Sequence, residues 1–126
     1  MTDEGPAHYF DMLDQLIEGH QFLRTTFNYT PRNSWSIDPF GHSGTFPYLL
    51  HKSGLSNMYI QRTHFAWKRH LSESRSLEFF WRQFFENPAT NPKPMMCHMS
   101  PLDLYSFKYA CGPDFKTCLD FDFRKI

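Results

Sequence analysis

The first apolar pattern along the chain has the spacing of a helix. From residue 9 to residue 23, apolar side chains recur at steps of three and four, which places them on one helical face. We expect this face to contact the core, and it consists of Tyr9, Phe10, Leu13, Leu16, Ile17, His20 and Leu23. Pro6 lies where a first-turn proline is tolerated, and Asn28 and Pro31 indicate where the helix ends.

The next segments have the pattern of a strand, a helix and a second strand. Residues 34–38 alternate apolar and small polar side chains, and residues 57–63 predict another strand. Between them, a short helix is expected to start near Ser43 and to stop at Gly54. Two strands joined by a helix at this spacing form a βαβ unit with parallel strands, so the sequence predicts an α/β fold.

The second half of the chain is less regular. Residues 64–77 are polar and charged and indicate either a loop or a surface helix. The pattern of residues 77–83 is compatible with either a strand or a buried turn. Residues 87–94 contain three prolines and predict a loop, and residues 95–99 predict a third strand.

Length and charge restrict the classes of function. The 126 residues fit one domain or part of one, which we assign to residues 1–126. Thirteen basic residues balance thirteen acidic ones, so the chain lacks the basic surface typical of a nucleic-acid-binding protein. No apolar run approaches the length of about 18 residues that a membrane helix needs. If the parent protein has a membrane anchor, we expect it outside this chain.

The chain is rich in aromatic residues, with 14 Phe, 6 Tyr and 3 Trp. Core packing is one role for so much aromatic area. The wall of a sugar-binding cleft is another, and composition alone leaves both open.

Two charged residues are predicted to meet at one edge of the sheet. Asp38 ends the first predicted strand, and Pro39 holds it in extended geometry because a residue before proline is pushed away from the α region. Arg62 lies near the end of the second strand. The carboxyl ends of parallel strands share a rim, so both side chains are expected there. Asp38 is either a turn cap or a nucleophile or metal ligand, and Arg62 is either a surface ion-pair partner or a support for that carboxylate.

The histidines and cysteines define no site by their spacing. None of the seven histidines forms a His-Glu-x-x-His motif or a close pair, so no self-contained zinc site is visible. His42 and His98 lie near predicted strand ends, where an ordinary structural role is the simplest interpretation. Of the three cysteines, Cys111 and Cys118 flank a short loop that suits a disulfide, but spacing leaves that pairing open.

One run of residues is similar to the signature of a known family. The run Trp35-Ser36-Ile37-Asp38-Pro39-Phe40-Gly41-His42-Ser43 resembles that of glycoside hydrolase family 38, the α-mannosidases. Residues 60–65 resemble the Golgi branch of the family more than the lysosomal branch. Further stretches that match the family are residues 8–10, 14–21, 48–50, 54–58, 77–83, 111–114 and 121–124. The resemblance therefore covers nearly the whole chain.

The resemblance implies a fold and a set of site residues. The chain is expected to be a fragment of the N-terminal catalytic domain, an α/β barrel with mostly parallel strands. Asp38 matches the catalytic nucleophile, which is also a zinc ligand, and Arg62 matches an arginine that supports the nucleophile and contacts substrate. Phe40 matches a residue near the bound sugar, and Tyr105 matches a tyrosine that contacts it.

The resemblance also implies the reaction and the setting. The parent protein is expected to be a retaining, Zn²⁺-dependent α-mannosidase that removes terminal α-linked mannose from N-glycans in the Golgi lumen, anchored as a type II membrane protein. Such a reaction needs two carboxyl groups, and the acid/base residue and the other zinc ligands are expected outside this chain. The isolated chain is therefore expected to be inactive. A bridge between Cys111 and Cys118 fits the family and an oxidising lumen.

Some positions depart from the family pattern. Where the family has Phe-Tyr-Ser-Tyr-Asp, this chain has Leu102-Asp103-Leu104-Tyr105-Ser106, so the aspartate after the tyrosine is lost. The family often has two adjacent cysteines where this chain has Cys118-Leu119. These departures favour an alternative hypothesis, a catalytically inactive or truncated relative that binds a glycan or a protein partner.

Overall fold

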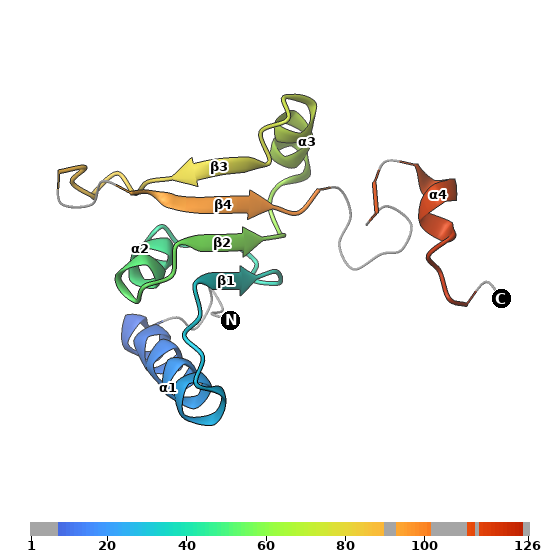
Figure 1. Cartoon of the computed structure of the whole chain (residues 1–126). Helices are drawn as coiled ribbons and strands as arrows, with labels where there is room; N and C mark the ends of the chain where they lie inside the picture. The colour runs from blue at the N-terminus through green and yellow to red at the C-terminus, as the bar shows by residue number, and fades with distance from the viewer. Residues whose placement is uncertain (1–7, 90–92, 102–110, 113, 125–126) are drawn as a thin grey trace.

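The chain folds around a mixed four-stranded sheet in the computed structural model, which describes residues 8–89, 93–101, 111–112 and 114–124. In this part of the chain the strands lie in the order β1-β2-β4-β3 (Figure 1). Their bounds are β1 Asn33–Ser36, β2 Asn57–Ile60, β3 Glu78–Trp81 and β4 Met95–Met99.

Strands β1, β2 and β4 run parallel, and β3 runs antiparallel to β4 at one edge. The predicted α/β class and the parallel βαβ unit are therefore confirmed. The first two strands end earlier than predicted, at Ser36 and at Ile60. Just beyond the second strand, the carbonyls of Gln61 and Arg62 bond to side chains.

Four helices accompany the sheet within the described residues: α1 Tyr9–Phe27, α2 Thr45–Lys52, α3 Phe65–Glu73 and α4 Phe115–Leu119. Asn28 ends α1 in the left-handed conformation, with φ 50°, and its backbone N–H bonds back into the last turn. Gly54, with φ 91°, allows the turn between α2 and β2. The segment after β2 is a helix and not a loop, and residues 78–81 form a strand and not a turn.

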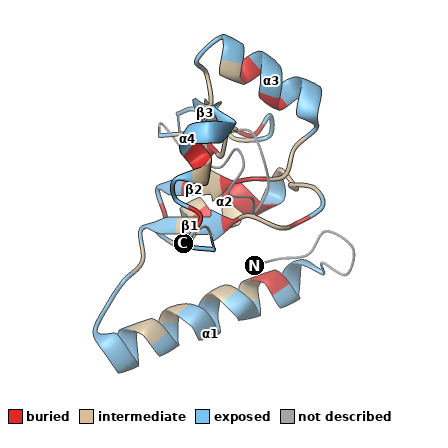
Figure 2. Cartoon of the chain, turned by 90° about the vertical axis from the view of Figure 1, so that its right-hand side faces the viewer, coloured by how far each residue is buried: buried red, intermediate tan, exposed pale blue. Residues whose placement is uncertain are grey.

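The core lies between the sheet and α2. Alternate residues of β4 are buried, namely Met95, Cys97 and Met99, as expected when one face of a strand meets the core. Met58 and Ile60 of β2 lie on the same face, and Phe46 and Leu50 of α2 pack against them. Figure 2 shows this concentration of buried residues around β2 and α2.

Helix α1 corrects one prediction. The predicted apolar face is confirmed only in part: Leu16 packs against the core beside the buried Met12, whereas Tyr9, Phe10 and Ile17 are exposed. Figure 2 shows α1 lying along one side of the molecule with most of its surface exposed. The apolar face was predicted from helical periodicity, but periodicity reports which residues share a face and not what covers that face.

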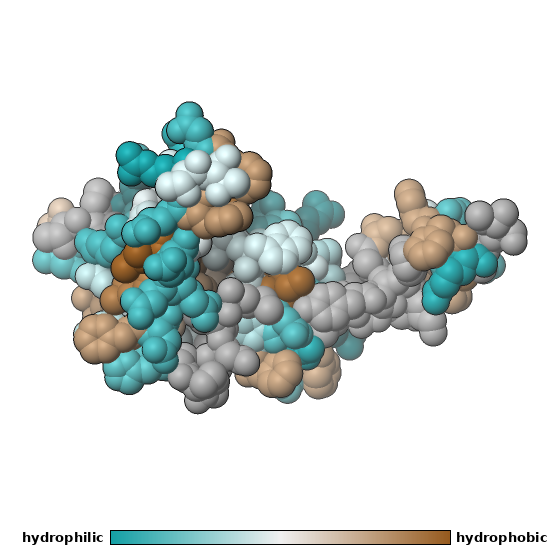
Figure 3. All heavy atoms as spheres, turned by 90° about the horizontal axis from the view of Figure 1, so that it is seen from below, coloured by the Kyte–Doolittle hydropathy of each residue, from teal (hydrophilic) through white to brown (hydrophobic). Residues whose placement is uncertain are grey.

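Many large aromatic residues are exposed in the described part of the chain. Phe84 is fully exposed, and Phe40, Phe65, Phe80 and Phe123 are each more than two-thirds exposed. In Figure 3, which views the molecule from below, several apolar side chains are visible at the surface.

None of the described helices is both long and apolar enough to cross a membrane.

A disulfide joins Cys111 and Cys118, whose Cα atoms are 5.4 Å apart. The bridge closes a short loop at the start of α4. Asp114 caps this helix, because its carboxylate accepts hydrogen bonds from the backbone N–H groups of Lys116 and Thr117. The Thr117 hydroxyl donates to the same carboxylate, and these bonds lower the pKa of Asp114.

Candidate active site

Asp38 and Arg62 form an ion pair at the carboxyl ends of β1 and β2. The Arg62 Nε–H donates to Asp38 Oδ1 at 2.8 Å, and Arg62 Nη2 lies 2.7 Å from the same oxygen. Both side chains are accessible, at 41% exposure for Asp38 and 37% for Arg62. Asp38 Oδ2 accepts no hydrogen bond from the described residues. The predicted meeting of these two residues at one rim is therefore correct.

Phe40 completes this group from the loop that follows Asp38. Its ring centroid lies 4.7 Å from Arg62 Cζ, within the range of a cation–π contact. The ring is 81% exposed, so its other face is open to a ligand. The three side chains thus present a carboxylate oxygen and an aromatic face side by side, and the guanidinium joins them.

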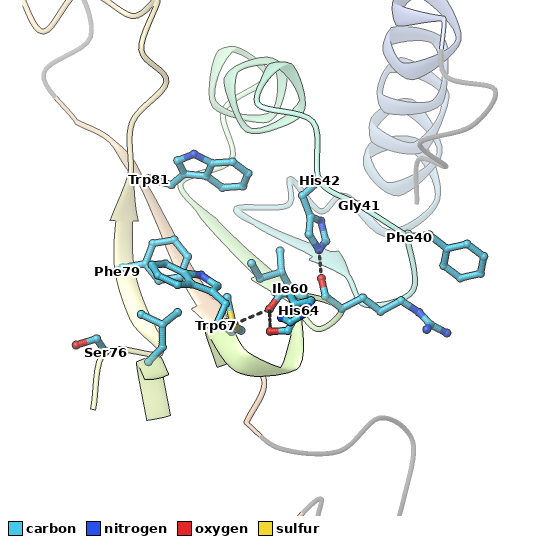
Figure 4. A pocket seen from close by; sticks show the side chains of 13 residues that line it. Phe40, Gly41, His42, Ile60, His64, Trp67, Ser76, Phe79 and Trp81 are labelled. Carbon is cyan, nitrogen blue, oxygen red and sulfur yellow. Dashed lines mark hydrogen bonds between the residues drawn. The ribbon is translucent and has the colours of Figure 1, made fainter. Parts of the chain in front are cut away.

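The backbone that carries Arg62 is also held by side chains. His42 Nε2 lies 2.8 Å from the Arg62 carbonyl oxygen, a contact marked by a dashed line in Figure 4. Lys68 Nζ donates to the Gln61 carbonyl at 2.6 Å and lies 3.3 Å from Gln61 Oε1. Sequence reasoning missed both contacts. His42 belongs to the signature run, but nothing in the sequence indicates that the charged Lys68 is buried.

An open pocket of about 970 Å³ adjoins the pair. Phe40, His42 and Arg62 line it, but Asp38 does not. The opposite wall is apolar and includes Trp67, Phe79 and Trp81, which Figure 4 shows across the space from His42. The aromatic excess in the composition therefore contributes to the wall of a pocket as well as to the core.

The described residues supply one candidate metal ligand and not a complete metal site. No three His, Cys, Asp or Glu side chains converge in the part of the chain that the structure describes. The Asp38 side chain is 41% exposed, and a carboxylate oxygen is a suitable zinc ligand. A four-coordinate zinc ion at Asp38 would need three ligands from elsewhere. Tyr105, the predicted sugar contact, lies outside the described residues.

The fold and this group of side chains define an α/β protein with a carboxylate and an arginine at the carboxyl rim of a parallel sheet. The family model for the Glycosyl hydrolases family 38 N-terminal domain matches residues 1–120. The chain therefore belongs to glycoside hydrolase family 38.

Similar proteins carry names consistent with that family. The chain is 48% identical over 126 residues to "Alpha-mannosidase 2x" of Mus musculus and to "Alpha-mannosidase 2" of Homo sapiens. It is 50% identical over 127 residues to "Alpha-mannosidase 2" of Mus musculus. Each alignment covers all of this chain but 11% of the relative, so the chain spans about a tenth of the length of these proteins.

Proposed function

We propose that this chain is the segment of a retaining, zinc-dependent α-mannosidase that carries its nucleophile, Asp38. The observation that supports this most directly is the asymmetric binding of the Asp38 carboxylate. Arg62 holds Oδ1 through two nitrogen atoms, whereas Oδ2 accepts no hydrogen bond from the described residues in a side chain that is 41% exposed. A nucleophilic carboxylate needs this combination of a fixed orientation and a free oxygen.

In the proposed reaction, Asp38 Oδ2 attacks the anomeric carbon of a terminal mannose. A bond forms between them as the glycosidic bond breaks, and an acid supplied from outside this chain protonates the leaving oxygen. Water then releases the sugar with retained configuration and restores the free carboxylate. Arg62 keeps Oδ1 in place through both steps, and Phe40 offers an apolar surface to the sugar ring.

The chemistry of Asp38 is compatible with a zinc ligand. The carboxylate provides one oxygen ligand, and we propose that the remaining ligands come from the rest of the parent protein. When bound, zinc supplies positive charge that orients sugar hydroxyl groups. We also propose that the four described strands are part of an α/β barrel, and that the parent acts on N-glycans in the Golgi lumen.

The proposal is tested by placing residues 1–126 in the matched segment of mouse Alpha-mannosidase 2, with which the chain shares 50% identity. The chimera is expected to hydrolyse an aryl α-mannoside and to release mannose of retained configuration. Asp38→Asn is expected to lower kcat by at least about a thousandfold, as removal of a nucleophile does. Asp14→Asn, on α1, is the matched control and should leave kcat unchanged.

A second measurement identifies the nucleophile directly. A fluorinated mannosyl fluoride should trap the glycosyl-enzyme, and peptide mass spectrometry should locate the label on Asp38. A correctly folded chimera that is as inactive as its Asp38→Asn variant would overturn the proposal. That result would favour the alternative of an inactive relative, which mannose binding without turnover would then support.

A further inference from the structure

Two consecutive carbonyl groups at the end of β2 are held by side chains from different segments. The Gln61 carbonyl accepts a hydrogen bond from Lys68 of α3 at 2.6 Å. The next carbonyl, that of Arg62, bonds to His42 at 2.8 Å. Lys68 is 8% exposed and Gln61 4%, so the first of these contacts is shielded from water.

We propose that His42 and Lys68 are positioning residues for the nucleophile, acting through the backbone of Arg62. The catalytic meaning of this inference rests on the proposed function. The side chains of Asp38 and Arg62 are each more than one-third exposed. An ion pair that is exposed to water contributes little energy, so it fixes the positions of its two side chains only weakly. A long arginine side chain can place its guanidinium accurately only if its backbone is fixed first.

The contacts around Arg62 form a closed ring. Asp38 binds the Arg62 side chain, the Arg62 carbonyl binds His42, and the chain leads from His42 back to Asp38 within four residues. The loop that carries the carboxylate thus also holds the backbone of its partner. If the end of β1 shifted relative to the end of β2, both the Asp38–Arg62 and the His42–Arg62 contacts would break. The ring of contacts therefore keeps the orientation of Asp38 Oδ2 fixed.

The His42 contact constrains which substitutions preserve the function. His42 Nε2 must donate a proton, because the carbonyl oxygen is only an acceptor. Glutamine offers an N–H₂ donor at a comparable distance from the backbone, whereas phenylalanine fills similar space without a donor. His42→Gln is therefore the conservative variant, and His42→Phe is the one that removes the bond.

The direct test is the NMR signal of the Arg62 Nε–H in the ¹⁵N-labelled 126-residue chain. His42→Phe and Lys68→Met are each expected to speed its exchange with water about tenfold, because the guanidinium leaves Asp38 more often. His42→Gln should restore slow exchange. His20→Phe, on α1, is the matched control. If exchange in His42→Phe equals that of the unmodified chain, the inference is wrong.

The chimera with mouse Alpha-mannosidase 2 provides the second test. His42→Phe should lower kcat at least about tenfold, with KM changed less than twofold, because a misaligned nucleophile affects the reacting step. His42→Gln should recover most of kcat, which a general loss of folded protein would not show. An unchanged kcat in His42→Phe contradicts the inference. A chimera inactive even without these changes contradicts only the proposed function, and the NMR exchange then decides the role of His42.

Discussion

Arg62 directs two nitrogen atoms at one oxygen of Asp38, although the two residues are 24 positions apart in the sequence. The adjacent parallel strands β1 and β2 bring them together, since both residues follow the carboxyl end of a strand. The pair is accessible to solvent, so its contribution to stability is at most about 1 kcal/mol. Its importance lies in the orientation of the carboxylate.

The first prediction separates these two roles of Arg62. In the chimera with mouse Alpha-mannosidase 2, Arg62→Met should lower kcat about a hundredfold, because the Asp38 carboxylate loses both contacts to Oδ1. Arg62→Lys keeps the charge but cannot donate through two nitrogen atoms to one oxygen, so it should recover only part of kcat. The thermal unfolding midpoint should change by about 2 °C or less in both variants. A large fall in the midpoint with unchanged kcat would show that the pair serves stability instead.

The sequence predicted the residues of this pair but not what holds them. The carboxyl ends of parallel strands lie at the same edge of a sheet, so the predicted strands were enough to place Asp38 and Arg62 at that edge. The bonds from His42 and Lys68 to backbone carbonyls depend on how a loop and a helix pack, and residue pattern carries no signal for that. For the same reason periodicity identified the apolar face of α1 but not its exposure.

The second prediction concerns Ser36, which lies two residues before Asp38 at the end of β1. Its side chain is 1% exposed, and its hydroxyl has no hydrogen-bond partner among the described residues. An unsatisfied buried hydroxyl costs about 1–3 kcal/mol. Ser36→Ala should therefore raise the free energy of unfolding of the 126-residue chain by about 1 kcal/mol, measured by urea denaturation.

Ser53 provides the control for that measurement. Its hydroxyl donates a hydrogen bond to the Leu49 carbonyl at 2.9 Å. Because Ser53→Ala removes this hydrogen bond, it should not stabilise the chain. A loss of stability in Ser36→Ala would show that its hydroxyl is bonded after all. The comparison of the two serines thus tests whether burial without a partner is the relevant difference.

The third prediction concerns the disulfide between Cys111 and Cys118. It closes a loop of sequence separation 7, for which loop-closure entropy gives about 2–3 kcal/mol. Figures 1 and 3 show the segment that contains α4 extending away from the sheet. Cys111→Ser with Cys118→Ser should therefore speed amide hydrogen exchange in α4 while leaving exchange in β2 and β4 unchanged. Equal acceleration in the sheet would mean that the bridge supports the whole fold.

The fourth prediction is a pH dependence that arises from Cys97, the free cysteine at the centre of β4. Burial raises the pKa of its thiol from the ordinary value of 9.0 to about 12, because the thiolate is poorly solvated there. Between these two values the unfolded chain loses the proton and the folded chain keeps it. The free energy of unfolding should thus be unaffected by Cys97 below about pH 9 and should fall as the pH rises toward 12, by on the order of 4 kcal/mol in total.

The variant Cys97→Ala isolates this effect from the tyrosines and lysines that titrate in the same range. Those groups remain in both proteins, so the difference between the two stability curves reports the thiol alone. The difference should be constant below pH 9 and should then change in favour of Cys97→Ala. A difference that stays constant up to pH 11 would show that the folded protein ionises Cys97 as readily as the unfolded chain. In that case a thiol reagent would also modify the folded protein at pH 10, whereas a buried, protonated thiol should react only after unfolding.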